Sequence, residues 1–204
     1  EDLPLIEYDV DRANELLDEA GWIDTTGNGI RDKVVVEGEP PVEMVLRFYT
    51  TDRQIRMDYQ VFIQEYLNEV GIATQLFPVP ATILFGPYAE RGITSTGNFD
   101  LALFALSTGP LSPFANVHTW FGCGQTPSPE NMGQGNNGWG FCDPEFDRLD
   151  LLVGETVDPE ERLEYAWEAQ RRLFEGRFWH GLYLRPTWYA VDGSQWNVDS
   201  MLDM

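Results

Sequence analysis

The sequence predicts an α/β fold in which helices flank a mixed β-sheet. Segments with the 3.6-residue helical period alternate along the chain with short extended runs, an order typical of α/β domains. Hydrophobic residues make up 43% of the 204 residues, which is ordinary for a chain that can bury a core. The length permits one domain or two small ones, and we expect a single domain over residues 1–204.

The first helix is expected to begin at Asp9 and to stop at Gly21. Apolar residues between them recur at helical spacing, and glycine readily takes the left-handed conformation that ends a helix. A polar turn over 24–32 follows. Two extended stretches, 33–36 and 42–50, then predict strands on either side of a Gly-Glu-Pro-Pro break.

A long second helix is expected between Thr51 and Gly71. Thr51 and Gln54 have the spacing of a capping box, in which the two residues satisfy each other's free backbone amides. One face of this helix is marked by Ile55, Tyr59, Phe62, Tyr66 and Val70. A strand is expected next, at 72–78.

Strand and helix continue to alternate in the second half. Residues 81–90 predict a helix, and 99–106 form a continuous apolar run typical of a strand covered on both faces. Asp143 and Asp158 each precede a proline, and an aspartate cap followed by proline predicts a helix start. The chain is expected to close with two short strands, 181–185 and 188–191.

The stretch 107–141 lacks periodicity and is rich in glycine, proline, asparagine and aromatic residues. A connection this long inside a compact domain is usually functional. Aromatic rings present flat apolar faces to sugars or peptide side chains, and the hydroxyl and amide groups between them supply uncharged hydrogen bonds. The alternative is that the rings only pack this loop against the sheet.

The charge balance excludes several classes of partner. Lys and Arg number 13 against 34 Asp and Glu, so the formal net charge is −21. Such a surface repels phosphate backbones and anionic lipid headgroups, so we expect no nucleic acid and no polybasic membrane contact. No apolar run reaches the length of a membrane span, and the opening Glu1 suggests a mature or excised fragment.

The two cysteines, Cys123 and Cys142, favour a disulfide that closes the loop between them. Two unrelated buried thiols are the alternative. The spacing does not suit a metal site, since there is no CxxC motif and the two histidines are far apart. A disulfide would place the chain outside the cytosol.

Other motifs argue for no metal, no cofactor and no catalytic residue. Asp24 to Asp32 resembles the first half of a calcium loop, but Val35 stands where the bidentate glutamate is needed, so we expect a hydrogen-bonded turn. Neither a GxSxG nor a GxxxxGK[ST] motif is present. A calcium-dependent interaction module and a glycoside hydrolase that uses paired carboxylates stay open as alternatives.

Residues 8–22 (YDVDRANELLDEAGW) resemble the segment that opens the second lobe of family 5 extracellular solute-binding proteins, the peptide, nickel and oligosaccharide receptors of ABC importers. Later motifs resemble those of the same family and occur in the same order. They are VGI at 70–72, NFDLAL at 98–103, NNGWGFCDPEFD at 136–147 and DPEER at 158–162. Each motif is short, but the resemblance extends over nearly the whole chain.

The resemblance implies a periplasmic-binding-protein-like lobe, namely the C-terminal lobe of a two-lobed receptor whose N-terminal lobe is absent from residues 1–204. It implies capture of a peptide or oligosaccharide-like solute and delivery to an ABC permease, without catalysis, by a monomer. For the full-length protein it implies a signal peptide and a periplasmic or extracellular location, with a lipid anchor at the N-terminus as one form of attachment. Dipeptide-binding relatives carry a disulfide after the same cleft loop, which supports the Cys123–Cys142 pair.

The resemblance places the cleft loop at 106–114. Peptide-binding relatives commonly have an acidic residue just before its proline, where it pairs with the ligand's amino terminus, but this chain has Ser112. A hydroxyl cannot compensate a buried ammonium, so we expect an oligosaccharide or a longer peptide held by its backbone. The candidate ligand-binding residues are Ser107, Thr108, Ser112, Phe114, Asn116, Trp120 and Trp139.

Overall fold

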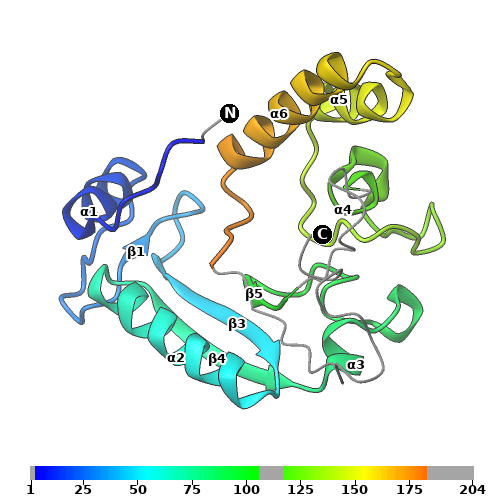
Figure 1. The fold of residues 1–204 in the computed structure, drawn as a ribbon. Coiled ribbons are helices and arrows are strands. Elements are labelled where there is room, and N and C mark those ends of the chain that lie inside the picture. The colour runs from blue at the N-terminus through cyan, green and yellow to red at the C-terminus, as the bar shows by residue number, and fades with distance from the viewer. Residues whose placement is uncertain (1–2, 106–116, 183–204) are drawn as a thin grey trace, which may run out of the picture.

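The computed structural model describes residues 3–105 and 117–182. Helices surround strands of both kinds, parallel and antiparallel, which confirms the α/β class (Figure 1). The described strands are divided between two small sheets and do not form one mixed sheet. The closing strands expected at 181–185 and 188–191 lie largely outside the described residues.

Three parallel strands form the larger sheet. Strand β3 (Val45–Thr51) lies between β4 (Ala73–Val79) and β5 (Leu101–Leu103). Helix α2 (Gln54–Glu69) joins β3 to β4 and packs against both strands (Figure 1). Within the described part of the expected strand 99–106, only the residues of β5 pair with β3.

The smaller sheet is antiparallel and pairs β1 (Asp32–Lys33) with β2 (Val42–Glu43). The chain changes sheets at Met44. Its N–H donates to a backbone carbonyl next to β1 at 2.7 Å, while its carbonyl accepts from the N–H of Ala73, in the larger sheet, at 3.0 Å. The single strand expected at 42–50 is therefore two strands in different sheets.

Two further expectations differ from the structure. The strand expected at 33–36 ends at Lys33, where its pairing with β2 stops, and the valines that follow are exposed. The helix expected at 81–90 is divided into α3 (Ala81–Leu84) and a 3-10 turn, η1 (Tyr88–Glu90). A Gly-Pro pair separates them, because proline cannot donate the backbone hydrogen bond that would continue a helix.

Helices α1 (Val10–Glu19), α5 (Pro144–Glu155) and α6 (Pro159–Glu175) begin where the sequence predicts. In each, the preceding aspartate carboxylate accepts hydrogen bonds from backbone N–H groups of the first turn, at 2.8 to 3.0 Å. The stop of α1 is also as expected, with Gly21 at a φ of +81°. These boundaries depend on contacts within a few residues, which is why the sequence reveals them.

Helix α2 differs from expectation in its cap and in the face that it buries. Its N-cap is Arg53, with no side-chain cap bond, so the Thr51–Gln54 capping box is not formed. The apolar residues predicted to share a face do so, yet Phe62 and Tyr66 are 56% and 55% exposed. The sheet side instead holds Gln60, 1% exposed, whose amide donates to a backbone carbonyl of β3 at 2.6 Å.

The second half of the chain has its own core. Helices α5 and α6 lie side by side, and the short helix α4 (His118–Phe121) packs below them (Figure 1). The buried residues at their junction are Phe121, Phe146, Leu149 and Ala169. No helix in the two described ranges has both the length and the apolar character needed to cross a membrane.

Candidate ligand-binding site

A cluster of aromatic rings connects the larger sheet with the helices of the second half. At its centre Trp139 is stacked between Phe104 and Trp120, with ring centroids 5.8 and 5.9 Å away and interplanar angles of 17° and 12°. Trp179 meets Trp139 edge-on at 4.8 Å. The indole N–H of Trp139 donates to the carbonyl of Trp120 at 2.8 Å, which holds the central ring in this orientation. We call these four residues the aromatic cluster.

Aromatic residues of the hydrophobic core pack against the aromatic cluster. Phe121, at 8% exposure, meets Trp179 edge-on at 5.5 Å, and also contacts the fully buried Phe146. Phe141 stacks on Phe178 at 4.2 Å in the same layer. Since these rings are packed on several sides, the aromatic cluster is a rigid surface that needs little ordering when a ligand binds.

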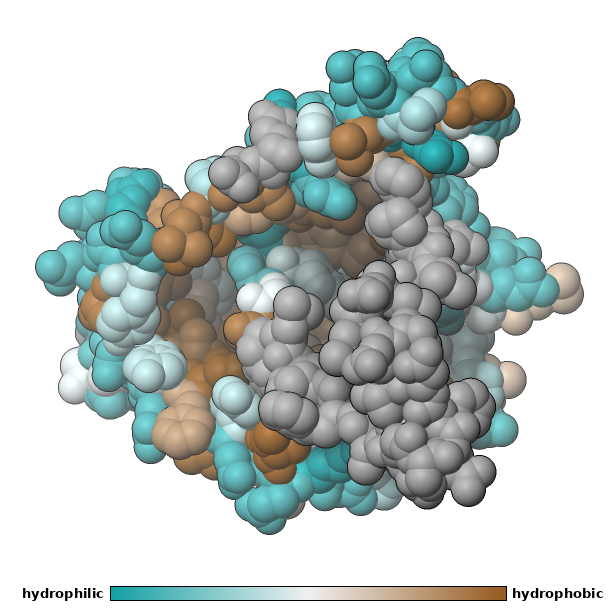
Figure 2. Space-filling view, in the orientation of Figure 1, coloured by the Kyte–Doolittle hydropathy of each residue, from teal (hydrophilic) through white to brown (hydrophobic). Residues whose placement is uncertain are grey.

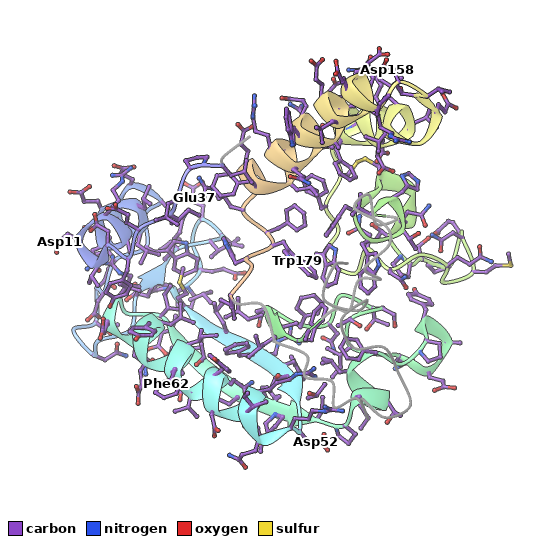
Figure 3. The ribbon with its side chains drawn as sticks, viewed as in Figure 1. Asp11, Glu37, Asp52, Phe62, Asp158 and Trp179 are labelled. Atoms are coloured by element: carbon purple, nitrogen blue, oxygen red, sulfur yellow. A yellow bond between two sulfur atoms is a disulfide. The ribbon has the colours of Figure 1, made fainter. Side chains whose placement is uncertain are left out.

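The members of the aromatic cluster are themselves half-buried, so each keeps part of its ring accessible. Figure 2 shows a hollow in the face of the molecule with hydrophobic surface on its visible walls. In the same orientation Trp179 lies in the central part of the view, among the surrounding helices and strands (Figure 3). A surface of this kind can bind apolar groups and the flat faces of sugars or peptide bonds.

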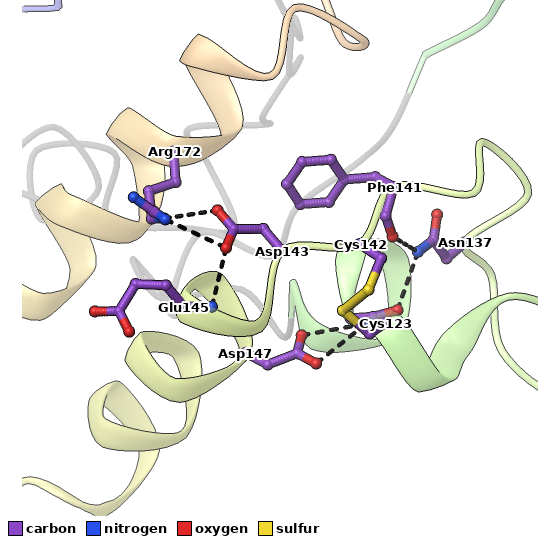
Figure 4. Close-up of a disulfide and its surroundings, with 9 residues drawn as sticks. Cys123, Asn137, Phe141, Cys142, Asp143, Glu145, Asp147 and Arg172 are labelled. Atoms are coloured by element: carbon purple, nitrogen blue, oxygen red, sulfur yellow. Dashed lines mark hydrogen bonds and ion pairs between the residues drawn. A yellow bond between two sulfur atoms is a disulfide. The ribbon is translucent and has the colours of Figure 1, made fainter.

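The disulfide between Cys123 and Cys142 is present and closes the loop that carries Trp139 (Figure 4). The N–H of Cys123 donates to both carboxylate oxygens of Asp147 at 3.2 Å. Inside the loop, the fully buried amide of Asn137 donates to two backbone carbonyls, at 3.0 and 2.6 Å. The bridge and these hydrogen bonds together position the central ring of the aromatic cluster.

Two pairs of polar side chains join the helices next to the disulfide. Arg172 of α6 donates to Asp143, the cap of α5, at 2.6 Å (Figure 4). This guanidinium lowers the pKa of Asp143, and backbone amides at the start of α5 lower it further. His118 lies 3.3 Å from Asp150. Burial raises the pKa of Asp150, and the nearby His118 opposes that rise.

The turn that resembles a calcium loop is hydrogen-bonded to itself. The carboxylate of Asp24 accepts from three backbone amides of the turn, at 2.7 to 3.2 Å, and the amide of Gly29 is the main cause of its lowered pKa. Asp32 accepts from the N–H and the hydroxyl of Thr25 at 2.9 and 2.7 Å. These carboxylates are directed at the protein's own donors, as in an Asx turn.

An open pocket of about 320 Å³ lies beside this turn, between α1 and the end of α2. Arg31 lies at its wall and donates to the carbonyls of Val70 and Trp22 at 2.7 and 2.6 Å. The same guanidinium binds the side chains of Asn14 and Asp18 in α1. Its donors are therefore used to connect α1, the turn and the end of α2, so this pocket is a structural junction.

Comparison with known proteins assigns the chain to a family. The family model described as "Bacterial extracellular solute-binding proteins, family 5 Middle" matches residues 1–128. The chain belongs to this family. The family 5 chain is 38% identical over 71 residues to the oligopeptide-binding protein AppA of Bacillus subtilis (strain 168), a match that covers 35% of this chain and 12% of AppA.

Solved structures of similar fold extend the likeness over more of the family 5 chain. The oligopeptide-binding protein of Thermus thermophilus, solved with a pentapeptide, is 27% identical with a TM-score of 0.73, over 85% of this chain and 29% of that one. NikZ of Campylobacter jejuni, solved with Ni(L-His), shares the fold at 20% identity and a TM-score of 0.66, over 84% and 31%. The chain thus spans less than a third of these relatives.

The sequence analysis predicted part of the candidate site. Of the predicted ligand-binding residues, Trp120 and Trp139 come together in the aromatic cluster. The others, which lie outside the described residues, are Ser107, Thr108, Ser112, Phe114 and Asn116. The sequence interpretation missed Phe104 and Trp179, because the first lies in an apolar run expected to be a strand and the second follows a helix with no motif. Their only signal was the local density of aromatic residues.

Proposed function

We propose that this chain is the C-terminal lobe of a two-lobed binding protein that captures a peptide outside the cytoplasmic membrane and delivers it to an ABC permease. The observation that carries the proposal is the fold shared with an oligopeptide-binding protein, at 27% identity over 85% of the chain. That relative was solved with a pentapeptide. A ligand of that length suits a chain with Ser112 in place of an acidic partner for the amino terminus.

In this proposal the aromatic cluster forms one wall of the cleft. Its rigid rings contact apolar side chains and peptide planes, and the loop residues Ser107, Thr108, Ser112, Phe114 and Asn116 complete the wall with hydroxyl, ring and amide groups. The second lobe, outside these 204 residues, supplies the opposite wall. Closure traps the ligand and creates the surface that a permease recognises.

The same proposal covers the other properties of the full-length protein. It acts without catalysis or cofactor, as a monomer in the periplasm or at the cell surface, where an N-terminal lipid can anchor it. An oxidising compartment is consistent with the Cys123–Cys142 disulfide. The high negative charge is compatible with small solutes and disfavours nucleic acid.

The test is ligand binding by the full-length protein, with peptide and oligosaccharide libraries screened by thermal shift and the hits titrated by calorimetry. Trp120→Ala should weaken the affinity for the best peptide about tenfold, because it removes an accessible ring from the wall. Trp167→Ala is the matched control, since Trp167 lies on α6, is 37% exposed and is not in the aromatic cluster.

Three outcomes would contradict this assignment. If no peptide shifts the melting temperature while an oligosaccharide does, the ligand class is wrong. If both tryptophan variants bind peptide with equal affinity, the aromatic cluster is not the binding wall. Release of reducing sugar from an oligosaccharide would instead indicate a glycoside hydrolase.

A further inference from the structure

Exposed carboxylates are distributed around the molecule. Asp11, Asp52 and Asp158 are all exposed and lie on three different sides of it, in α1, after β3 and before α6 (Figure 3). Even if each of the 13 basic side chains neutralised one carboxylate, 21 of the 34 would stay unbalanced. The negative charge is therefore a property of the surface as a whole and does not mark one docking patch.

Basic side chains on this surface are already engaged by the protein itself. Arg12 contacts Glu15 at 2.8 Å and Glu19 at 3.3 Å, so one guanidinium serves two carboxylates. Lys33 is the one lysine of the sequence, and its ammonium donates to the carbonyl of Ala20 at 2.6 Å. Since basic residues are few and engaged in this way, most of the carboxylates depend on ions from the solvent for neutralisation.

The ends of the helices add to the electrostatic repulsion. Helices α1, α2, α5 and α6 each end on a glutamate, at the end where the helix dipole is negative. Lys33 and Arg31 donate to carbonyls at the ends of α1 and α2, and α6 has Arg172 in its last turn. The last turn of α5 has no basic residue, so Glu155 lies there against the dipole. Such a carboxylate destabilises its helix in dilute buffer, and salt weakens the effect.

The spacing of the carboxylates indicates how much salt is needed to screen them. Exposed glutamates lie four residues apart on α2 and on α6; the pairs are Glu65 with Glu69 and Glu160 with Glu164. Side chains with this spacing on a helix have Cβ atoms about 5 to 6 Å apart. The Debye length is about 10 Å in 0.1 M salt and about 3 Å in 1 M salt. Repulsion within these pairs is therefore screened only as the salt concentration approaches about 1 M.

We propose that this protein is adapted to surroundings of about molar salt, where dissolved cations screen its acidic surface and bring the folded state to its full stability. The inference rests on charge and spacing and is independent of the proposed function. A basic protein partner would neutralise carboxylates on one side only, whereas these lie on several sides (Figure 3). Ions in the solvent reach all of them.

The experiment follows thermal unfolding of the full-length protein in KCl at neutral pH. The wild-type melting temperature should rise by more than about 10 °C between about 0.1 M and about 2 M KCl, because the carboxylates repel one another less as screening increases. Glu155→Gln should raise the melting temperature by roughly 1 °C in the dilute buffer, because it removes a charge that opposes the α5 dipole. This gain should vanish in the concentrated buffer.

Glu145→Gln is the matched control at the other end of α5. Glu145 lies in the first turn, where the dipole favours a carboxylate, and it contacts Arg148 at 2.6 Å. Its neutralisation should therefore lower the melting temperature in the dilute buffer. The same chemical change is thus expected to have opposite signs at the two ends of one helix.

Three results would overturn the proposal. If the wild-type melting temperature is the same at both salt concentrations, the rest of the full-length protein already neutralises this surface. If sucrose at equal osmolarity gives the same rise as KCl, exclusion of the solute from the protein surface is the cause, and not charge screening. If Glu155→Gln lowers the melting temperature as Glu145→Gln does, the carboxylate of Glu155 is not repelled. None of these results involves peptide binding, so the proposed function stands or fails on its own test.

Discussion

Replacing both cysteines of the Cys123–Cys142 disulfide with serine should lower the free energy of unfolding by about 3 kcal/mol. The sequence separation of the bridged residues is 19, and the chain-entropy relation for a loop of that length gives this value. The folded loop should keep its shape without the bridge. The N–H of Asn136 still donates to the carbonyl of Thr119, and that of Asn137 to the carbonyl of Gln125, both at 3.0 Å.

The effect should therefore arise mainly in the unfolded chain, which becomes free to explore more conformations. For a protein of this size, 3 kcal/mol corresponds to a fall of roughly 6 to 12 °C in melting temperature. Urea denaturation followed by tryptophan fluorescence measures the free energy, and Trp139 inside the loop makes the signal sensitive to this region.

The single variants Cys123→Ser and Cys142→Ser are the controls, because either one removes the whole bridge. Both should be destabilised as much as the double variant. A loss below about 1 kcal/mol in the double variant would refute the loop-closure argument. Unequal losses in the two single variants would show that sulfur packing, and not loop closure, sets the stability.

Three further predictions concern single residues. Asp143→Ala removes the α5 cap and the partner of Arg172 and should cost about 1 to 2 kcal/mol. The pKa of Asp143 is lowered in the folded state, so wild type should be more stable than Asp143→Ala above the unfolded pKa of about 4. This difference in the free energy of unfolding should be lost as the pH falls through the folded pKa. Urea denaturation midpoints measured over an acidic pH series test it. Gly71→Ala should lower the melting temperature more than Gly38→Ala. Both glycines have a positive φ, +79° and +88°, so both variants carry backbone strain, but only the Cβ at position 71 would lie 2.8 Å from an arginine side chain. Asp24→Ala should cost about 1 kcal/mol, and millimolar calcium should leave the wild-type melting temperature unchanged; a rise would identify the turn as a cation site.

Helix starts were predictable because they depend on neighbours in sequence. Asp9, Asp143 and Asp158 each accept hydrogen bonds from amides within three residues, so the signal and the structure lie in the same short segment. Strands were less predictable. The change of sheets at Met44 depends on a bond to Ala73, about thirty residues away, which local pattern does not contain.

The candidate site divides in the same way. Trp120 and Trp139 were found because they lie in an aromatic-rich loop that also carries the disulfide. Phe104 and Trp179 join them only through ring contacts between segments far apart in the chain. Such contacts form when the core packs, and no single segment encodes them.

The sequence by itself determined the α/β class, the family, the cysteine pair, the acidic surface, the starts of α1, α5 and α6, and the stop of α1. Each of these depends on composition, ordered motifs or hydrogen bonds between near neighbours. The tertiary structure alone decided which face of α2 is buried. Hydrophobic spacing marked the face of Phe62 and Tyr66, but the carbonyls of the sheet bind Gln60 and leave those rings outside. A buried backbone carbonyl must find a donor, and that requirement becomes visible only when helix and sheet are together.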